Sequence, residues 1–153
     1  MAQSLATFRT VVFMKQPAYR ELREVFDAVN EDYQYAVFRP DAGIAAIASE
    51  IYETDLTVYF PGNRITWARA LEELGARSLR PATYEEMLGF AAPHFDARFK
   101  GAPVFAAGSV ALIGKEERIA CLWHDNRGRV LDLGWYGRDF REYCGLLAAR
   151  LAG

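Results

Sequence analysis

The last third of the chain holds three apolar segments in a row, and this pattern constrains the fold more than any other. The segments are residues 103–113, 118–124 and 129–136. Two short polar joints, residues 114–117 and 125–128, separate them. Each joint contains a glycine, which readily takes the positive φ angles of tight hairpin turns. Three strands with an apolar face can hold together where a lone hairpin cannot. The pattern therefore predicts a three-stranded antiparallel meander.

The middle segment of the three is apolar on both faces. Strand alternation gives two largely apolar sets of residues, Ile119, Cys121 and Trp123 on one face and Ala120, Leu122 and His124 on the other. A strand of this kind is typical of the centre of a sheet that is covered on both sides. Gly108 and Ser109 inside the first strand indicate a bulge or a close approach of another backbone. After the meander, residues 139–151 show an apolar stripe with helical spacing, formed by Phe140, Tyr143, Cys144, Leu147 and Leu151.

In the first two thirds of the chain, segments with strand-like patterns are interspersed with segments that have helix-like patterns. Alternation predicts strands at residues 6–14, 33–39 and 55–60, while residues 44–51 fit either state. Helical periodicity predicts helices at residues 17–29, 66–74 and 83–93.

Local signals mark the ends of the two later helices. Gly75 is a natural C-cap for the first of them. Thr83 and Glu86 have the spacing of a capping box at the start of the second, and Pro93 ends it.

Together these elements predict one α+β domain spanning residues 1–153. Its core is a mixed or mainly antiparallel sheet of five to six strands with a C-terminal three-stranded meander and helices packed on it. The chain of 153 residues can bury enough surface to fold without a metal or a disulfide. Cys121 and Cys144 are therefore interpreted as buried small hydrophobic residues.

The charge balance argues against two classes of partner. The formal net charge is −2, and a nucleic-acid binder usually shows a basic excess, so no nucleic acid is expected. The longest charge-free run, residues 101–114, is shorter than the roughly 20 residues that span a bilayer. Arg9 and Thr10 interrupt the apolar run at the start, so we expect no signal peptide and a cytoplasmic protein.

The sequence lacks the common short motifs for phosphate, dinucleotide and metal binding, and it predicts no cofactor and no metal. The best catalytic candidate is His124, which with Asp125 or Asp132 could act as a general base in a small hydrolase-like enzyme. Neighbours on a strand point to opposite sides, so His124 and Asp125 need not touch. The alternative is an aspartate that shapes the turn and a histidine that bonds a neighbour.

Other histidine, cysteine and carboxylate residues give weaker indications of a metal or catalytic site. His94 with His124, Cys121 or Asp96 could form a zinc site, but the chain contains only two histidines. Two carboxylate pairs lie on predicted helices without evidence of a shared cleft, namely Glu72 with Glu73 and Glu85 with Glu86.

Two short helices with nearby basic residues are also the elements of a helix-turn-helix. The connection at residues 75–82 is longer than the usual turn of 3–4 residues, and Glu85 and Glu86 would face phosphates. The nearby basic residues would then either bind an acidic partner or lie on a solvated surface. These residues are Arg77, Arg80, Arg98 and Lys100.

Aromatic residues make up 14% of the chain, more than a small core requires. They include Tyr33, Tyr35, Tyr52, Tyr59, Trp123, Trp135 and Tyr136. Aromatic side chains and arginine dominate binding hot spots. We therefore expect a non-enzymatic module that binds a protein partner through Trp135, Tyr136 and Arg138. A homo-oligomer and a small-ligand pocket are alternatives; the small residues Ala106, Ala107 and Gly108 could make room for such a pocket.

Overall fold

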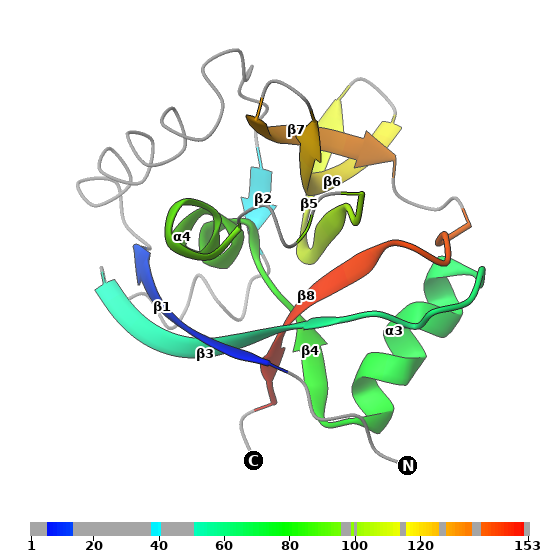
Figure 1. Cartoon of the computed structure of the whole chain (residues 1–153), viewed down its shortest axis with the longest axis horizontal. Coiled ribbons are helices and arrows are strands. Elements are labelled where there is room, and N and C mark those ends of the chain that lie inside the picture. The colour runs from blue at the N-terminus through cyan, green and yellow to red at the C-terminus, as the bar shows by residue number, and fades with distance from the viewer. Residues whose placement is uncertain are drawn as a thin grey trace.

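The computed structural model describes residues 6–13, 38–40, 51–95, 99, 101–113, 116–125, 128–135 and 139–151. In these residues the protein is an α+β structure built on one sheet (Figure 1). The strands are β1 (Thr7–Phe13), β2 (Phe38–Pro40), β3 (Ile51–Tyr59), β4 (Leu79–Pro81), β5 (Val104–Ile113), β6 (Glu116–Asp125), β7 (Gly128–Trp135) and β8 (Gly145–Arg150). The described helices are α3 (Trp67–Ala76) and α4 (Tyr84–His94).

The described sheet is mixed. Six strands follow one another in the order β1-β3-β8-β5-β6-β7, and the short strands β2 and β4 pair with β5 and β8. Strands β5 and β8 run parallel, and the other described pairs are antiparallel. The predicted meander does not end the fold, because β8 follows β7 in the chain and inserts between β3 and β5. Sequence proximity could not reveal this long-range insertion.

The predicted helix at residues 139–151 is wrong, because the chain forms strand β8 there. Neighbouring residues of β8 are buried on opposite faces of the sheet: Leu147 lies in one core cluster and Leu146 in the other. A helix would bury one stripe and expose the rest, whereas a central strand needs a continuous apolar run. Residues 145–149 supply that run, and their helical spacing is a coincidence of composition.

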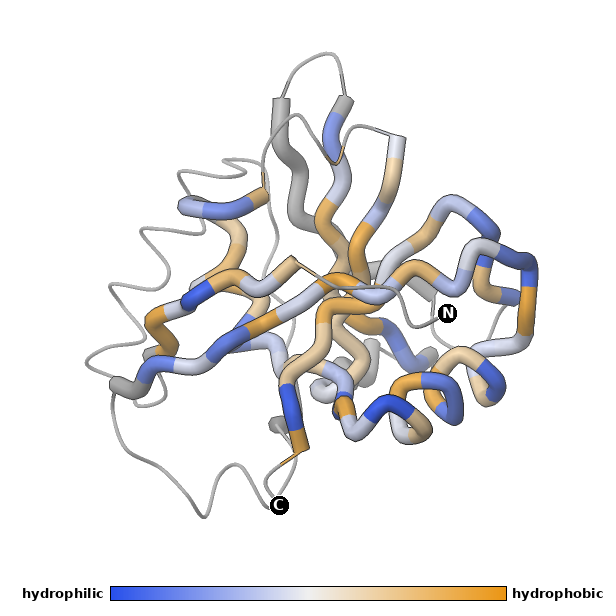
Figure 2. Tube along the Cα trace, turned by 60° about the horizontal axis from the view of Figure 1, so that its bottom comes forward, coloured by the Kyte–Doolittle hydropathy of each residue, from blue (hydrophilic) through white to orange (hydrophobic). Residues whose placement is uncertain are grey.

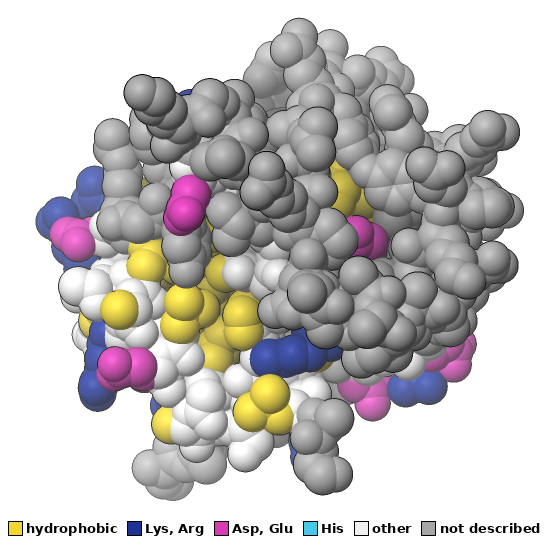
Figure 3. All heavy atoms as spheres, turned by 180° about the vertical axis from the view of Figure 1, so that it is seen from behind, with side chains coloured by type: hydrophobic (Ala, Val, Ile, Leu, Met, Phe, Trp, Pro, Cys, Tyr) yellow, Lys and Arg dark blue, Asp and Glu magenta, His cyan; other side chains and the backbone are white. Residues whose placement is uncertain are grey.

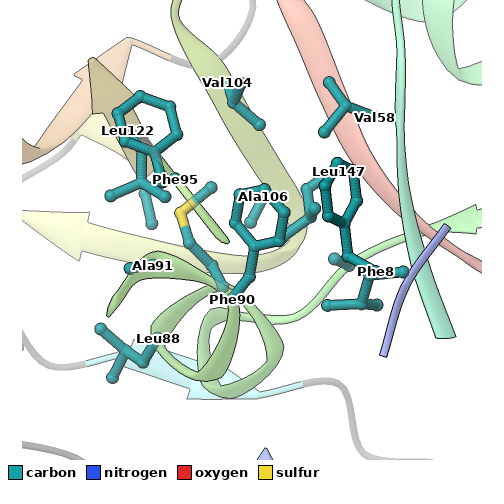
Figure 4. Close-up of a cluster of buried hydrophobic side chains, with 14 of the residues drawn as sticks. Phe8, Val58, Leu88, Phe90, Ala91, Phe95, Val104, Ala106, Leu122 and Leu147 are labelled. Carbon is teal, nitrogen blue, oxygen red and sulfur yellow. The ribbon is translucent and has the colours of Figure 1, made fainter. Parts of the chain in front are cut away.

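The two helices cover opposite faces of the central strands. Helix α4 closes a core with β1, β3, β5, β6 and β8, and Figure 4 shows Phe90 of α4 beside Phe8, Ala106 and Leu147. Helix α3 closes the second core, where Trp67 packs with Leu146 and Phe140. Hydrophobic residues lie mainly where strands and helices meet (Figure 2). The described residues thus form two apolar layers, one on each face of β8.

The predicted bulge at Gly108 and Ser109 is confirmed. The pairing of β5 with β6 shifts register between Ala106 and Ala111. At the bulge, Gly108 N donates to the carbonyl of Ala82 at 2.8 Å. A Cβ on Gly108 would lie 2.6 Å from that carbonyl oxygen, so only glycine allows this approach. The bulge thus joins β5 to the chain that leads into α4.

The capping box at the start of α4 is also confirmed. The Thr83 hydroxyl accepts from Glu86 N at 3.2 Å, and the Glu86 carboxylate accepts from Thr83 N at 2.9 Å. Pro93 lies inside α4 rather than at its end, and the helix continues to His94.

The end of α3 differs from the prediction at Gly75. Gly75 lies inside the helix, Arg77 is the C-cap, and Ser78 takes the positive φ of 57° that follows. The short strand β4 then fills part of the connection to α4.

The predicted strands near the N-terminus are described only in part. Strand β1 alternates as expected, with Phe8 and Val12 buried and Val11 exposed. Strand β3 begins earlier than the predicted residue 55, at Ile51. The predicted helix at residues 17–29, most of the predicted strand at 33–39 and most of the ambiguous segment at 44–51 lie outside the described residues.

Candidate interaction surface

Two loops, residues 61–66 before α3 and residues 139–144 before β8, are fastened to each other. Ile65 N donates to Phe140 O at 3.0 Å, and Phe140 N donates to Ile65 O at 2.7 Å. The buried Phe140 ring stands edge-on to the Trp67 ring, with centroids 4.9 Å apart. Because the backbones are paired and their aromatic anchor is buried, the outer side chains of both loops stand on a firm support.

The outer side chains of these loops form what we call the tyrosine–arginine surface. Tyr143 is 51% exposed, more than the other large hydrophobic residues found at the described surface. A salt bridge of 3.0 Å links Arg64 to Asp139, and both side chains are more than half exposed. The surface consists of Arg64, Asp139, Arg141, Glu142 and Tyr143. It therefore combines an accessible aromatic ring with arginines, as binding hot spots often do.

Most of this surface comes directly after the predicted binding residues in the sequence. Trp135 is the last residue of β7, where it pairs with Arg118 of β6. Tyr136 and Arg138 lie outside the described residues. The C-terminal part of the tyrosine–arginine surface begins at residue 139, in the connection between β7 and β8. This connection joins two strands, whereas the sequence predicted a strand-to-helix joint.

Sequence reasoning missed Tyr143 as a surface residue. The helical pattern assigned it to a buried stripe, but in the structure it projects from the turn before β8. In that turn, Cys144 N donates to the carbonyl of Arg141 at 3.1 Å. The charged pair Arg141 and Glu142 just before Tyr143 was the available signal, because a solvated turn is where such a pair is expected.

Of the other aromatic residues in the predicted set, Tyr59 belongs to the core. Tyr59 is buried, its hydroxyl donates to Glu73 at 2.6 Å, and the Arg77 guanidinium lies 4.5 Å above its ring centre. Burial, followed by the hydrogen bond with the Glu73 carboxylate, raises the pKa of the Tyr59 hydroxyl. Tyr33 and Tyr35 lie outside the described residues.

The candidate catalytic residues do not share one face in the strand register. His124 pairs with Arg129, whereas Asp132 pairs with Cys121, a position that alternates with His124 along β6. Asp125, next to His124 in the strand, also occupies an alternate position. Nδ1 of His124 is buried and has no hydrogen-bond partner. The geometry therefore assembles no histidine–carboxylate pair at that nitrogen.

The two histidines have separate surroundings. Nε2 of His94 lies 2.8 Å from the carbonyl oxygen of Arg9, to which it donates, and the His94 ring packs beside Phe8 and Phe90. Asp96 lies outside the described residues. In the part of the chain that is described, no three histidine, cysteine or carboxylate side chains gather as metal ligands would.

Both cysteines are buried free thiols, as the sequence predicted. Burial raises the pKa of the Cys144 thiol, which favours the neutral form over the nucleophilic thiolate.

The basic residues around the helices are engaged in the fold. Arg80 bonds the Glu86 carboxylate, and Arg77 covers Tyr59. Arg98 and Lys100 lie outside the described residues. Strand β4 separates the two helices, unlike a helix-turn-helix. On the face shown in Figure 3, the described basic and acidic side chains are interspersed.

The stretch proposed as a ligand pocket is tightly packed. Ala106 is completely buried in the first core. Gly108 lies so close to the carbonyl oxygens of Pro81 and Ala82 that a single added carbon would approach both within 2.7 Å. The small residues here make room for a backbone rather than for a ligand.

No described helix is long and apolar enough to cross a membrane. Comparison of the chain with protein-family models, with curated proteins and with solved structures gives no significant match.

Proposed function

We propose that this protein is a non-enzymatic interaction module that binds another protein through the tyrosine–arginine surface and through Trp135, Tyr136 and Arg138, which precede Asp139 in sequence. The observation that carries the proposal is the exposure of Tyr143 on a loop whose neighbours are fixed by paired backbones and a buried phenylalanine. An exposed aromatic ring on a firm support loses little conformational freedom when a partner covers it.

The charges around Tyr143 indicate the chemistry of the partner. Arg141 and Glu142 immediately precede Tyr143 in sequence, and Arg64 already forms a salt bridge with Asp139. A protein surface that offers carboxylates or backbone carbonyls to the arginines and an apolar recess to the tyrosine fits this arrangement. Positive and negative side chains lie side by side on this surface. They would therefore fix the orientation of a bound partner more than they would add to the net attraction between the two proteins.

A co-purification experiment with matched variants tests the proposal. The tagged wild-type protein, Tyr143→Ala and Arg141→Ala are used to capture partners from the native cytosol. Val11→Ala is the control, because Val11 is 42% exposed on the outer face of β1, outside this surface. Proteins retained by the wild type and by Val11→Ala should be lost with the two surface variants.

A second pair of variants tests the residues that precede Asp139 in sequence. Trp135→Ala and Arg138→Ala should weaken capture of the same proteins if those residues extend the surface. Thermal unfolding of each variant separates lost binding from lost folding. Full capture by a folded Tyr143→Ala, Arg141→Ala double variant contradicts the proposal. Capture only of the chain itself, with a doubled mass in solution, identifies a homo-oligomer instead.

A further inference from the structure

Two adjacent glutamates at the start of α4 are both buried but have different surroundings. Glu86 is completely buried, and Arg80 donates to its two oxygens at 2.8 Å each. Thr83 N also donates to Glu86, at 2.9 Å. Glu85 is only 7% exposed, and its Oε2 has no hydrogen-bond partner. The fold therefore supplies hydrogen-bond donors to both oxygens of Glu86 but leaves Oε2 of Glu85 without a hydrogen-bond partner.

Among the described residues, no hydrogen-bond donor reaches Oε2 of Glu85. Arg80 of β4 is held by Glu86. The described elements that pack against α4 place uncharged side chains in this core: Phe8, Thr10 and Val12 from β1, Ser109 from β5, and Ala120 and Leu122 from β6. The titratable groups on the same face of β6 include Arg118 and His124, which alternate with Ala120 and Leu122 along the strand. Burial is the main influence on Glu85 and raises the pKa of its carboxyl group. A backbone hydrogen bond and Thr83 act against this shift, whereas the charge of Glu86 adds to it.

The first turn of α4 is also a structural junction. Tyr84 N donates to the Ser109 hydroxyl of β5 at 2.9 Å, and Ala82 N donates to the Leu147 carbonyl of β8 at 2.8 Å. A charge that appears on Glu85 therefore appears where α4 is attached to the sheet. An unpaired buried charge is among the most destabilising features that a fold can contain.

We propose that the first turn of α4 is a pH-sensitive joint, in which the folded protein holds Glu85 as the neutral acid and ionisation of Glu85 loosens the attachment of α4 to the sheet. The sign follows from proton linkage. Between the ordinary pKa of 4.5 and the higher pKa in the fold, the folded state binds a proton that the unfolded state has released. Stability from this group is therefore complete below 4.5 and is lost as the pH rises through the folded-state pKa.

The first test compares the wild type with Glu85→Gln by denaturant unfolding, from pH 4.5 to about pH 8. The wild type should lose stability relative to Glu85→Gln as the pH rises, by a factor of about 10 in the unfolding constant for each unit by which the pKa is raised. The readout is how the ratio of the two unfolding constants, wild type over Glu85→Gln, changes with pH. A difference in stability between the two proteins that is the same at every pH does not affect this readout. Glu72→Gln is the control, because the Glu72 side chain is 70% exposed on α3, and its curve should run parallel to the wild type.

The second test needs no substitution and reads the group directly. Carbon-13 NMR of the side-chain carboxyl of Glu85 in the intact wild-type protein gives its titration midpoint. A midpoint above 4.5 with parallel movement of the α4 amide signals supports the proposal. A midpoint at or below 4.5, or unfolding curves for wild type and Glu85→Gln that stay parallel across the range, overturns it.

Discussion

Arg80 and Glu86 form a two-point ion pair that ties the last residues before α4 to its first turn. Nη1 and Nη2 of Arg80 lie 2.8 Å from Oε1 and Oε2 of Glu86, which is completely buried. Glu86 also accepts the capping bond from Thr83 N. The Glu86 carboxylate thus accepts hydrogen bonds both from the Arg80 guanidinium and from the backbone N–H at the N-cap of α4.

Replacing this carboxylate should be costly. Glu86→Ala removes the carboxylate that pairs with Arg80 and the acceptor of Thr83 N, so we expect a loss of about 3–5 kcal/mol in the free energy of unfolding, as for other broken buried pairs. Urea unfolding at neutral pH measures it. Glu72→Ala on the exposed surface of α3 is the control, and a similar small change for both would show that the pair contributes little.

Two glycines should respond oppositely to alanine. Gly108→Ala places a Cβ against the carbonyl oxygens of Pro81 and Ala82, at 2.7 and 2.6 Å, so we expect a loss of about 1–3 kcal/mol. Gly75→Ala meets no atom within 4 Å inside α3 and should stabilise the protein by about 0.5–1 kcal/mol. Thermal and urea unfolding of the two variants provides the comparison; equal effects would mean that the bulge does not enclose Gly108 as described.

Ser78 should tolerate glycine better than alanine. Its φ of 57° lies in the left-handed region, which costs a residue with a Cβ about 1–2 kcal/mol. Ser78→Gly relieves this strain but loses part of the gain to chain entropy, so we expect it to be about 1 kcal/mol more stable than Ser78→Ala. A less stable glycine variant would show that the turn after α3 does not require this conformation.

Tyr59→Phe should remove both a bond and a pH effect. Loss of the 2.6 Å hydrogen bond to Glu73 should destabilise the protein by about 1–2 kcal/mol at neutral pH. Because the pKa of Tyr59 is raised, the folded state keeps its proton above the ordinary value of 10.0, and stability from this group is lost as the pH rises through the folded-state pKa. Unfolding curves in alkaline buffer should therefore converge for wild type and Tyr59→Phe, and a constant gap would contradict this.

Local patterns predicted some of the local features, although the C-cap at Gly75 and the helix end at Pro93 were wrong. The spacing of Thr83 and Glu86 identified the capping box, and Gly108 beside Ser109 identified the bulge, because each is decided by residues close together in sequence. The alternation in β1 also placed Phe8 and Val12 inside.

Features that depend on distant partners could not be predicted in the same way. Strand β8 was taken for a helix because its apolar residues fit a 3.6-residue period, and only its position between β3 and β5 explains why both of its faces are buried. The same error assigned Tyr143 to the core. No short-range pattern reveals that Arg80 meets Glu86, or that the turn containing Tyr143 is fastened to the loop before α3.

The most direct test of the central claim is the affinity for the captured partner, measured by titration calorimetry with purified wild type, Tyr143→Ala and Val11→Ala. A hot-spot tyrosine contributes about 2 kcal/mol or more, so Tyr143→Ala should raise Kd by about 30-fold or more while Val11→Ala leaves it unchanged. An unchanged Kd for a folded Tyr143→Ala protein would contradict the claim that this protein works through the tyrosine–arginine surface.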